Sequence, residues 1–185
     1  MNDSVFQQFF QDCVGSWVSE RTYHYLSHNE IERSRTEFSV SPLTSDAKSK
    51  VIADNSYQQL DNLASLPGFN LSFYTINDKG QEVRQNLNLM FVPTSESGNA
   101  LEGDYLRDRA YEEDRPIISH FRFDSQTKEL LMRTNYTSVV SVDSITLSNP
   151  QTRIRRILNY QRPPQSQPLE KILLAGFGVE QKVSA

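Results

Sequence analysis

Cysteine is nearly absent from this sequence, since Cys13 is its one cysteine in 185 residues. A single thiol excludes an intramolecular disulfide and leaves no further cysteine to build a thiolate metal site. An excess of positive charge is also missing, because 19 basic side chains stand against 23 acidic ones and give a formal net charge of -4. Such a chain lacks the global field that usually accompanies nucleic-acid binding. We expect a protein of a reducing, intracellular compartment that binds neither DNA nor RNA.

Long hydrophobic runs are missing as well. Apolar stretches such as residues 172–175 are far shorter than the roughly 20 residues that span a bilayer. Residues 1–12 are acidic and lack the apolar segment of a secretory signal peptide. The sequence therefore predicts a cytoplasmic protein that has no membrane-spanning segment and no targeting segment.

The motifs of several common enzyme classes do not occur. The sequence has no GxSxG nucleophile elbow and no HExxH zinc motif, and the Gly-Phe-Gly sequence at 176–178 is too short for a phosphate-binding loop. His24 and His28 lie four residues apart, a spacing that would suit zinc on a helix. Tyr23 and Tyr25 beside His24 instead favour a strand that runs into a turn. We predict no metal site.

The residues that are present indicate a folded domain, since 37% are hydrophobic and 23% are charged. The length fits one domain over residues 1–185. Apolar side chains recur at helical spacing near the start, which predicts a helix over residues 1–13 that closes one end of the fold, with Trp17 also structural. These side chains are Val5, Phe6, Phe9, Phe10 and Cys13. On this face Cys13 is expected to be a small buried hydrophobe rather than a reactive thiol, and we assign it no catalytic role.

From residue 17 onward the pattern changes to short runs rich in Val, Ile, Thr, Tyr and Phe, which are typical of strands. The gaps are too short for the crossovers of a parallel sheet, so we expect antiparallel hairpins. The expected strands cover residues 15–26, 31–41, 69–76, 82–92, 100–109, 116–124, 129–136, 141–148, 152–160 and 171–183. Residues 44–66 leave room for a second helical segment, and the proline-rich residues 162–168 predict a mobile loop.

The predicted fold class is therefore all-β with an N-terminal helix. About ten antiparallel strands close a barrel like those of lipocalins and fatty-acid-binding proteins. A barrel of this size can hold one small ligand inside.

Arginines at strand spacing are the strongest candidates for ligand binding. Arg153 and Arg155 lie two residues apart and project to the same face of a strand, and Arg107 and Arg109 form a second such pair. A guanidinium inside a barrel requires an anion, which is a carboxylate of the protein or of a ligand. Two arginines that face the interior would suit a dicarboxylate. The spacing alone leaves a second possibility, in which the pairs face solvent or bond to nearby acids. These acids are Asp108, Glu112 and Asp114.

Four short blocks of sequence carry a resemblance to a known family. The blocks are residues 15–22 with His24, residues 106–111 with 116–117, the Asn149-Pro150 turn with residues 153–155, and residues 178–180. Because of the order and spacing of these four blocks, the chain resembles the S-type phycobiliprotein lyases, the CpcS/CpeS/CpcU group. These lyases attach linear tetrapyrroles, called bilins, to cysteines of light-harvesting phycobiliproteins.

The resemblance implies a ten-stranded calycin barrel whose cavity or mouth receives the bilin. Arg21, Arg153 and Arg155 match the family's basic ligand contacts, which hold the propionates. Glu180 matches its C-terminal acid, and Asp143 falls where many members have a glutamate. The resemblance implies that these acids are catalytic and contact the pyrrole nitrogens.

Two further positions depart from the family pattern. Phe73 stands where members often have a tryptophan at the ligand, and Ile157 stands where a small polar residue is usual. Together with the shorter Asp143, these departures lead us to expect that the chain works with a second S-type lyase subunit. The alternative that the chain forms a homodimer remains open.

The implied reaction needs no nucleophile from the lyase, because the attacking thiolate belongs to the acceptor protein. Phycocyanobilin or a related bilin is the expected substrate, with no permanently bound cofactor. The expected acceptors are apo-subunits of the phycocyanin, allophycocyanin or phycoerythrocyanin type. The location implied is the cyanobacterial cytoplasm or, in an alga, the chloroplast stroma.

Two other functions stay open from the residues themselves. The arginines could bind the carboxylate of a fatty acid or another small apolar anion in a non-enzymatic carrier, or the barrel could be a structural adaptor of the antenna. If Arg153 and Arg155 face the interior without protein partners, replacing both with alanine should leave the stability largely intact or improved.

Overall fold

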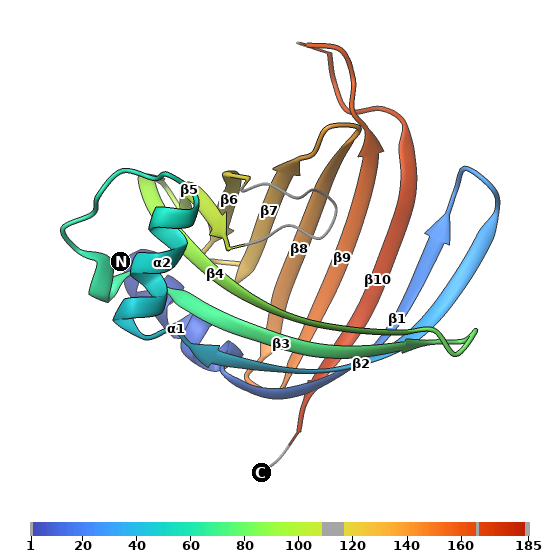
Figure 1. Ribbon diagram of the computed structural model, residues 1–185, viewed down its shortest axis with the longest axis horizontal. Coiled ribbons are helices and arrows are strands. Elements are labelled where there is room, and N and C mark those ends of the chain that lie inside the picture. Colours follow the sequence, from blue (N-terminus) through green and yellow to red (C-terminus); the bar gives the residue numbers. More distant parts are fainter. Residues whose placement is uncertain (1, 109–116, 166, 184–185) are drawn as a thin grey trace.

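A computed structural model of the protein describes residues 2–108, 117–165 and 167–183. Within these ranges ten antiparallel strands close into one barrel in the order β1-β10-β9-β8-β7-β6-β5-β4-β3-β2 (Figure 1). The strands are β1 (Gly15–Tyr25), β2 (Glu30–Pro42), β3 (Gly68–Asn77), β4 (Glu82–Ser97), β5 (Ala100–Arg107), β6 (Ser119–Asp124), β7 (Glu129–Asn135), β8 (Val139–Asn149), β9 (Thr152–Gln161) and β10 (Ile172–Lys182). The predicted fold class is confirmed.

Most strand ends lie within two residues of the sequence prediction, and two differ by three or more. The strand predicted to stop at Val92 continues to Ser97, because the β4–β5 register shifts at Pro93 and a bulge can accommodate a residue without an N–H. The strand predicted from residue 116 is wrong at its start, since β6 begins at Ser119. Ile117 packs instead beside Tyr136 in a small cluster of its own. Residues 109–116 lie outside the described ranges.

The helix α1 (Asn2–Cys13) closes one end of the barrel, as its apolar spacing predicts. Phe6 is fully buried and stacks on Phe121, with ring centroids 5.3 Å apart and an interplanar angle of 6°. Phe10 stacks on Phe69 at 4.8 Å. The aromatic end of α1 therefore merges with the barrel core, and the interior of the barrel is filled at this end.

A second helix, α2 (Ser45–Asp54), and a short 3-10 helix, η1 (Leu63–Ser65), lie in the segment where a second helical piece was predicted. Figure 1 shows α2 outside the barrel, alongside β4. The side chain of Thr44 caps α2 by accepting a hydrogen bond from Ala47 N at 3.3 Å. The buried Lys48 joins α2 to η1, because its Nζ donates to three backbone carbonyls. These carbonyls belong to Leu63, Ala64 and Leu66.

The segment between β9 and β10 carries no regular helix or strand in its described residues, 162–165 and 167–171. It projects at the end of the barrel away from α1 (Figure 1). In the part of the chain that the structure describes, no helix is long and apolar enough to cross a membrane.

Candidate ligand cavity

The barrel encloses a cavity of about 450 Å³. Volumes of this order are usual for pockets that bind small organic ligands. Phe9, Phe10 and Cys13 of α1 form its floor, and Tyr23 and Tyr25 of β1 line it toward the opposite end. Alternate residues of the strands form its wall, because successive side chains of a strand point to opposite faces.

Arg153 and Arg155 both face this cavity, which decides between the two orientations that their spacing allows. The intervening Ile154 does not line it, and Arg156 binds Ser144 and Glu129 on the outside of the barrel. The structure thus supplies the convergent pair of arginines that a dicarboxylate ligand would require.

Arg153 has a protein partner at the floor of the cavity. Its Nε donates to Glu180 Oε2 at 2.6 Å, and the two residues are direct cross-strand neighbours in β9 and β10. The guanidinium also lies over two rings, with its central carbon 4.6 Å from the Trp17 centroid and 5.0 Å from the Phe38 centroid. Arg153 therefore has a protein partner without any ligand, which removes the condition under which its replacement by alanine was expected to leave the fold unharmed.

Glu180 connects Arg153 to Arg21. The carboxylate is 0% exposed, and its Oε1 accepts a hydrogen bond from Arg21 Nη2 at 3.5 Å. Burial acts to raise the pKa of Glu180, but the positive charges of Arg153, Arg155 and Arg21 outweigh it and hold the pKa below its usual value of 4.5. Glu180 is not among the residues that line the cavity. Its position is that of a buried counterion that orients two arginines.

The absence of a side chain at Gly178 leaves room for the side chain of Arg21. Gly178 of β10 is the cross-strand neighbour of both Arg21 in β1 and Arg155 in β9. A Cβ at Gly178 would lie 3.1 Å from Arg21 Cγ and 3.1 Å from Ser19 Oγ. The bare backbone at this position therefore lets Arg21 lie over β10.

Asp143 is the predicted acid that does line the cavity. Its side chain is 22% exposed, and Oδ1 accepts a hydrogen bond from Arg155 Nη2 at 3.1 Å. Because a carboxylate has two oxygens and several lone pairs, it can also accept hydrogen bonds from N–H groups of a ligand. The two acids predicted to be catalytic thus occupy different environments: Asp143 faces the cavity and Glu180 lies behind the arginines.

Two more predicted ligand residues face the cavity away from this charged group. Phe73 lines the wall contributed by β3, and Arg107 lies across the barrel on β5. Arg107 Nη2 donates to Tyr136 Oη at 2.8 Å, and the guanidinium lies 5.6 Å from the ring centroids of both Tyr105 and Tyr136. Arg109, its predicted companion, lies outside the described residues, as do Glu112 and Asp114. Asp108 accepts hydrogen bonds from Asn88.

Sequence reasoning missed the proximity of Cys13 to Arg153. The thiol is buried and lines the cavity, where the positive charge of Arg153 acts on it. Burial raises the pKa of this thiol, which keeps it protonated at neutral pH. Trp17 is buried as predicted, and its Nε1 donates to Cys13 O at 2.9 Å. The helical spacing pointed to burial of Cys13, but nothing in the sequence indicated which charged residue it would meet.

Comparison with known proteins decides which barrel family this is. The CpeS-like protein family matches residues 5–183. The chain belongs to this family. It is 56% identical over 179 residues to "Chromophore lyase CpcS/CpeS 1" of Synechococcus sp. (strain JA-3-3Ab), and the match covers 97% of each chain. It is 25% identical to "Phycocyanobilin lyase subunit CpcS" of Picosynechococcus sp. (strain ATCC 27264 / PCC 7002 / PR-6), over 80% of this chain and 75% of that protein.

A solved structure shows the same fold. The S-type phycobiliprotein lyase CPES from Guillardia theta superposes with a TM-score of 0.77 and 16% identity, over 97% of this chain and 93% of that one. The match to the CpeS-like family confirms the resemblance inferred from the sequence, and a carrier of fatty acids is not favoured.

Proposed function

We propose that this protein is a chromophore lyase that holds a linear tetrapyrrole in its barrel while a cysteine of a phycobiliprotein subunit attacks it. The observation that carries the proposal is the group of three arginines and one partly exposed acid on the cavity wall of a CpeS-like chain. Family membership supports the reaction class, and the cavity supports a ligand that carries carboxylates.

The ligand that fits this group best is a bilin with two propionates, and phycocyanobilin is our specific candidate. Arg155 and Arg21 offer guanidinium donors for the carboxylates, and Arg153 supports them from the floor of the cavity. The name of the Picosynechococcus relative supports phycocyanobilin as the substrate. Phe73 offers a ring face to the conjugated system, and Arg107 offers a further positive charge on the opposite wall.

In the proposed reaction, the acceptor's S–H adds across the exocyclic ethylidene double bond of the bilin. A C–S bond forms, the C=C π bond breaks, and a proton is taken up at the ring carbon, so no oxidant or reductant is needed. Asp143 accepts hydrogen bonds from pyrrole N–H groups and fixes the tetrapyrrole's conformation. The barrel's contribution is to position the reacting carbon and exclude wrong additions.

Adjacent residues of β9 provide a matched test. Arg155 faces the cavity and Arg156 faces outward. In absorbance titrations with phycocyanobilin, the wild type should shift and sharpen the visible spectrum. Arg155→Gln should weaken binding about ten- to a hundredfold through loss of a charged hydrogen bond, whereas Arg156→Gln should bind like the wild type.

Three results would contradict the proposal: an unchanged spectrum on addition of the wild type, displacement of the bilin by fatty acids, or equal losses in the two variants. Thermal unfolding of each variant shows whether a loss of binding reflects loss of the fold. Covalent attachment is then followed with apo-subunits of phycocyanin, allophycocyanin and phycoerythrocyanin as acceptors.

We further propose that the chain acts in the cytoplasm or chloroplast stroma with a second S-type lyase subunit. Phe73, Asp143 and Ile157, which all line the cavity, depart from the family pattern and support this dependence. The Picosynechococcus relative is itself named a subunit. Attachment should be slow with this chain alone and faster after the second protein is added. Full-rate attachment by this chain alone would refute the dependence.

A further inference from the structure

The proposed reaction requires a cysteine of another protein to reach a ligand inside this barrel. The chain's own cysteine, Cys13, lies at the end that α1 closes. The cavity continues toward Tyr25 at the opposite end, where the β1–β2 and β3–β4 hairpins turn. The acceptor must therefore contact this opposite end of the barrel, which we call the mouth.

Large apolar side chains are exposed around the mouth. Leu26 is 50% exposed and Ile31 is 53% exposed, both at the tip of the β1–β2 hairpin, and Val83 at the start of β4 is 48% exposed. Val83 also lines the cavity, so this one side chain belongs both to the cavity wall and to the exposed surface. Large apolar side chains exposed beside a ligand cavity are a common feature of binding surfaces.

The two hairpins that carry these side chains are held together. Lys79 in the β3–β4 turn pairs with Glu30 of β2. Asp78 N donates to Arg33 O at 2.8 Å, which adds a backbone link between the same hairpins. A surface fixed before binding loses less conformational entropy when a partner docks.

We propose that Leu26, Ile31 and Val83, together called the mouth patch, form the docking surface for the acceptor protein that supplies the thiol. This inference rests on the proposed function. Leu26 and Ile31 lie on the outer side of the β1–β2 hairpin at the mouth, so an acceptor that docks on them lies beside the entrance of the cavity.

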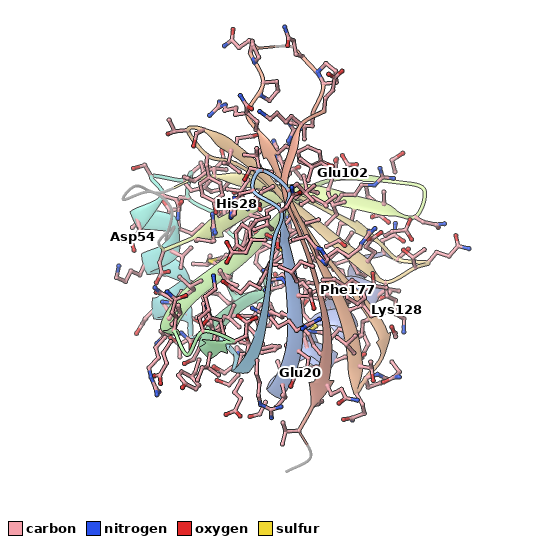
Figure 2. The ribbon with its side chains drawn as sticks, turned by 90° about the vertical axis from the view of Figure 1, so that its right-hand side faces the viewer. Glu20, His28, Asp54, Glu102, Lys128 and Phe177 are labelled. Atoms are coloured by element: carbon pink, nitrogen blue, oxygen red, sulfur yellow. The ribbon has the colours of Figure 1, made fainter. Side chains whose placement is uncertain are left out.

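A second exposed apolar pair provides the control. Phe177 is 50% exposed and Val179 is 41% exposed on the outer face of β10. Figure 2 shows Phe177 on this face and His28 in the β1–β2 turn, at separate places on the molecule. The test compares Leu26→Ser/Ile31→Ser with Phe177→Ser/Val179→Ser, and leaves Val83 unchanged because it lines the cavity.

The measurements are bilin affinity by absorbance and attachment rate as a function of apo-subunit concentration. The mouth variant should bind phycocyanobilin like the wild type and raise the KM for the acceptor at least about tenfold, as for residues central to an interface. The control variant should leave both quantities unchanged.

An unchanged acceptor KM in the mouth variant would overturn the proposal. If that variant instead dissociates a dimer of this chain in sedimentation, with the acceptor KM unchanged, the patch is a self-interface and the proposal is also wrong. A raised KM in the control variant alone would place the acceptor on β10. Failure of the proposed function would look different, because the wild type itself would then bind no bilin.

Discussion

Replacing Glu180 with glutamine tests whether this buried acid holds the arginines in place. Glu180 is 0% exposed and accepts a hydrogen bond from Arg153 at 2.6 Å, with Arg21 at 3.5 Å. Glu180→Gln keeps the shape of the side chain but leaves buried guanidiniums without their counter-charge. Removing one partner of a buried ion pair costs about 3–5 kcal/mol. Because glutamine can still accept a hydrogen bond from Arg153, we expect a loss of about 3 kcal/mol, at the lower end of that range.

For a chain of this length, each kcal/mol lowers the melting temperature by about 2–4 °C, so Glu180→Gln should lower it by about 6–12 °C. Glu20 provides the control, since its pair with Arg35 lies at the surface with side chains 69% and 50% exposed. Surface pairs contribute about 0–1 kcal/mol, and Glu20→Gln should shift the melting temperature by less than about 4 °C. Thermal unfolding followed by circular dichroism measures both. Equal, small shifts in the two variants would refute the counterion role.

The pH dependence gives a second measurement of the same effect. The pKa of Glu180 is lowered in the folded protein from its usual value of 4.5, so the folded state binds fewer protons at this site than the unfolded state. Its stabilising contribution is present above about pH 4.5 and is lost as the pH falls through the folded pKa. Glutamine does not titrate. The difference in melting temperature between the wild type and Glu180→Gln should therefore shrink below pH 4.5, and a constant difference would contradict the ionised state.

Three further predictions concern α1, the cavity wall and α2. Deleting residues 1–12 removes three buried phenylalanines, each of which contributes about 1.5–3 kcal/mol. The deletion should therefore lower the melting temperature by many degrees or prevent folding. A truncated chain as stable as the full one would show that the helix is dispensable. Gly176→Ala would place a Cβ 2.6 Å from the Tyr23 ring and push that ring into the cavity. The affinity for phycocyanobilin should therefore fall about tenfold, and the double variant Gly176→Ala/Tyr23→Leu should recover it. An unchanged affinity in the single variant would contradict this. Lys48→Met leaves three backbone carbonyls without their ammonium donor, so it should lower the free energy of unfolding by about 1–3 kcal/mol and speed hydrogen exchange around η1. Lys50→Met, at an exposed position, should change neither quantity. Equal exchange in the two variants would show that Lys48 does not hold η1 to α2.

The sequence determined the elements of this fold because their side-chain patterns are local. A period of two residues marked the strands, helical spacing marked α1, and short polar gaps required antiparallel hairpins. The same period placed Arg153 and Arg155 on one face of a strand. It could not determine which face became the interior, because that depends on how the whole sheet closes.

The tertiary structure alone decided the partners of the predicted site residues. Glu180 meets Arg153 because the antiparallel register of β9 and β10 makes them neighbours, although they are 27 positions apart in sequence. Burial distinguishes two acids that looked equivalent in the sequence: Asp143 faces the cavity, whereas Glu180 is buried behind the arginines. Strand periodicity specifies alternation along one chain segment, but register, closure and burial are properties of pairs of segments. A single strand's sequence therefore fixes the direction of its side chains relative to one another, and the assembled barrel fixes what they face.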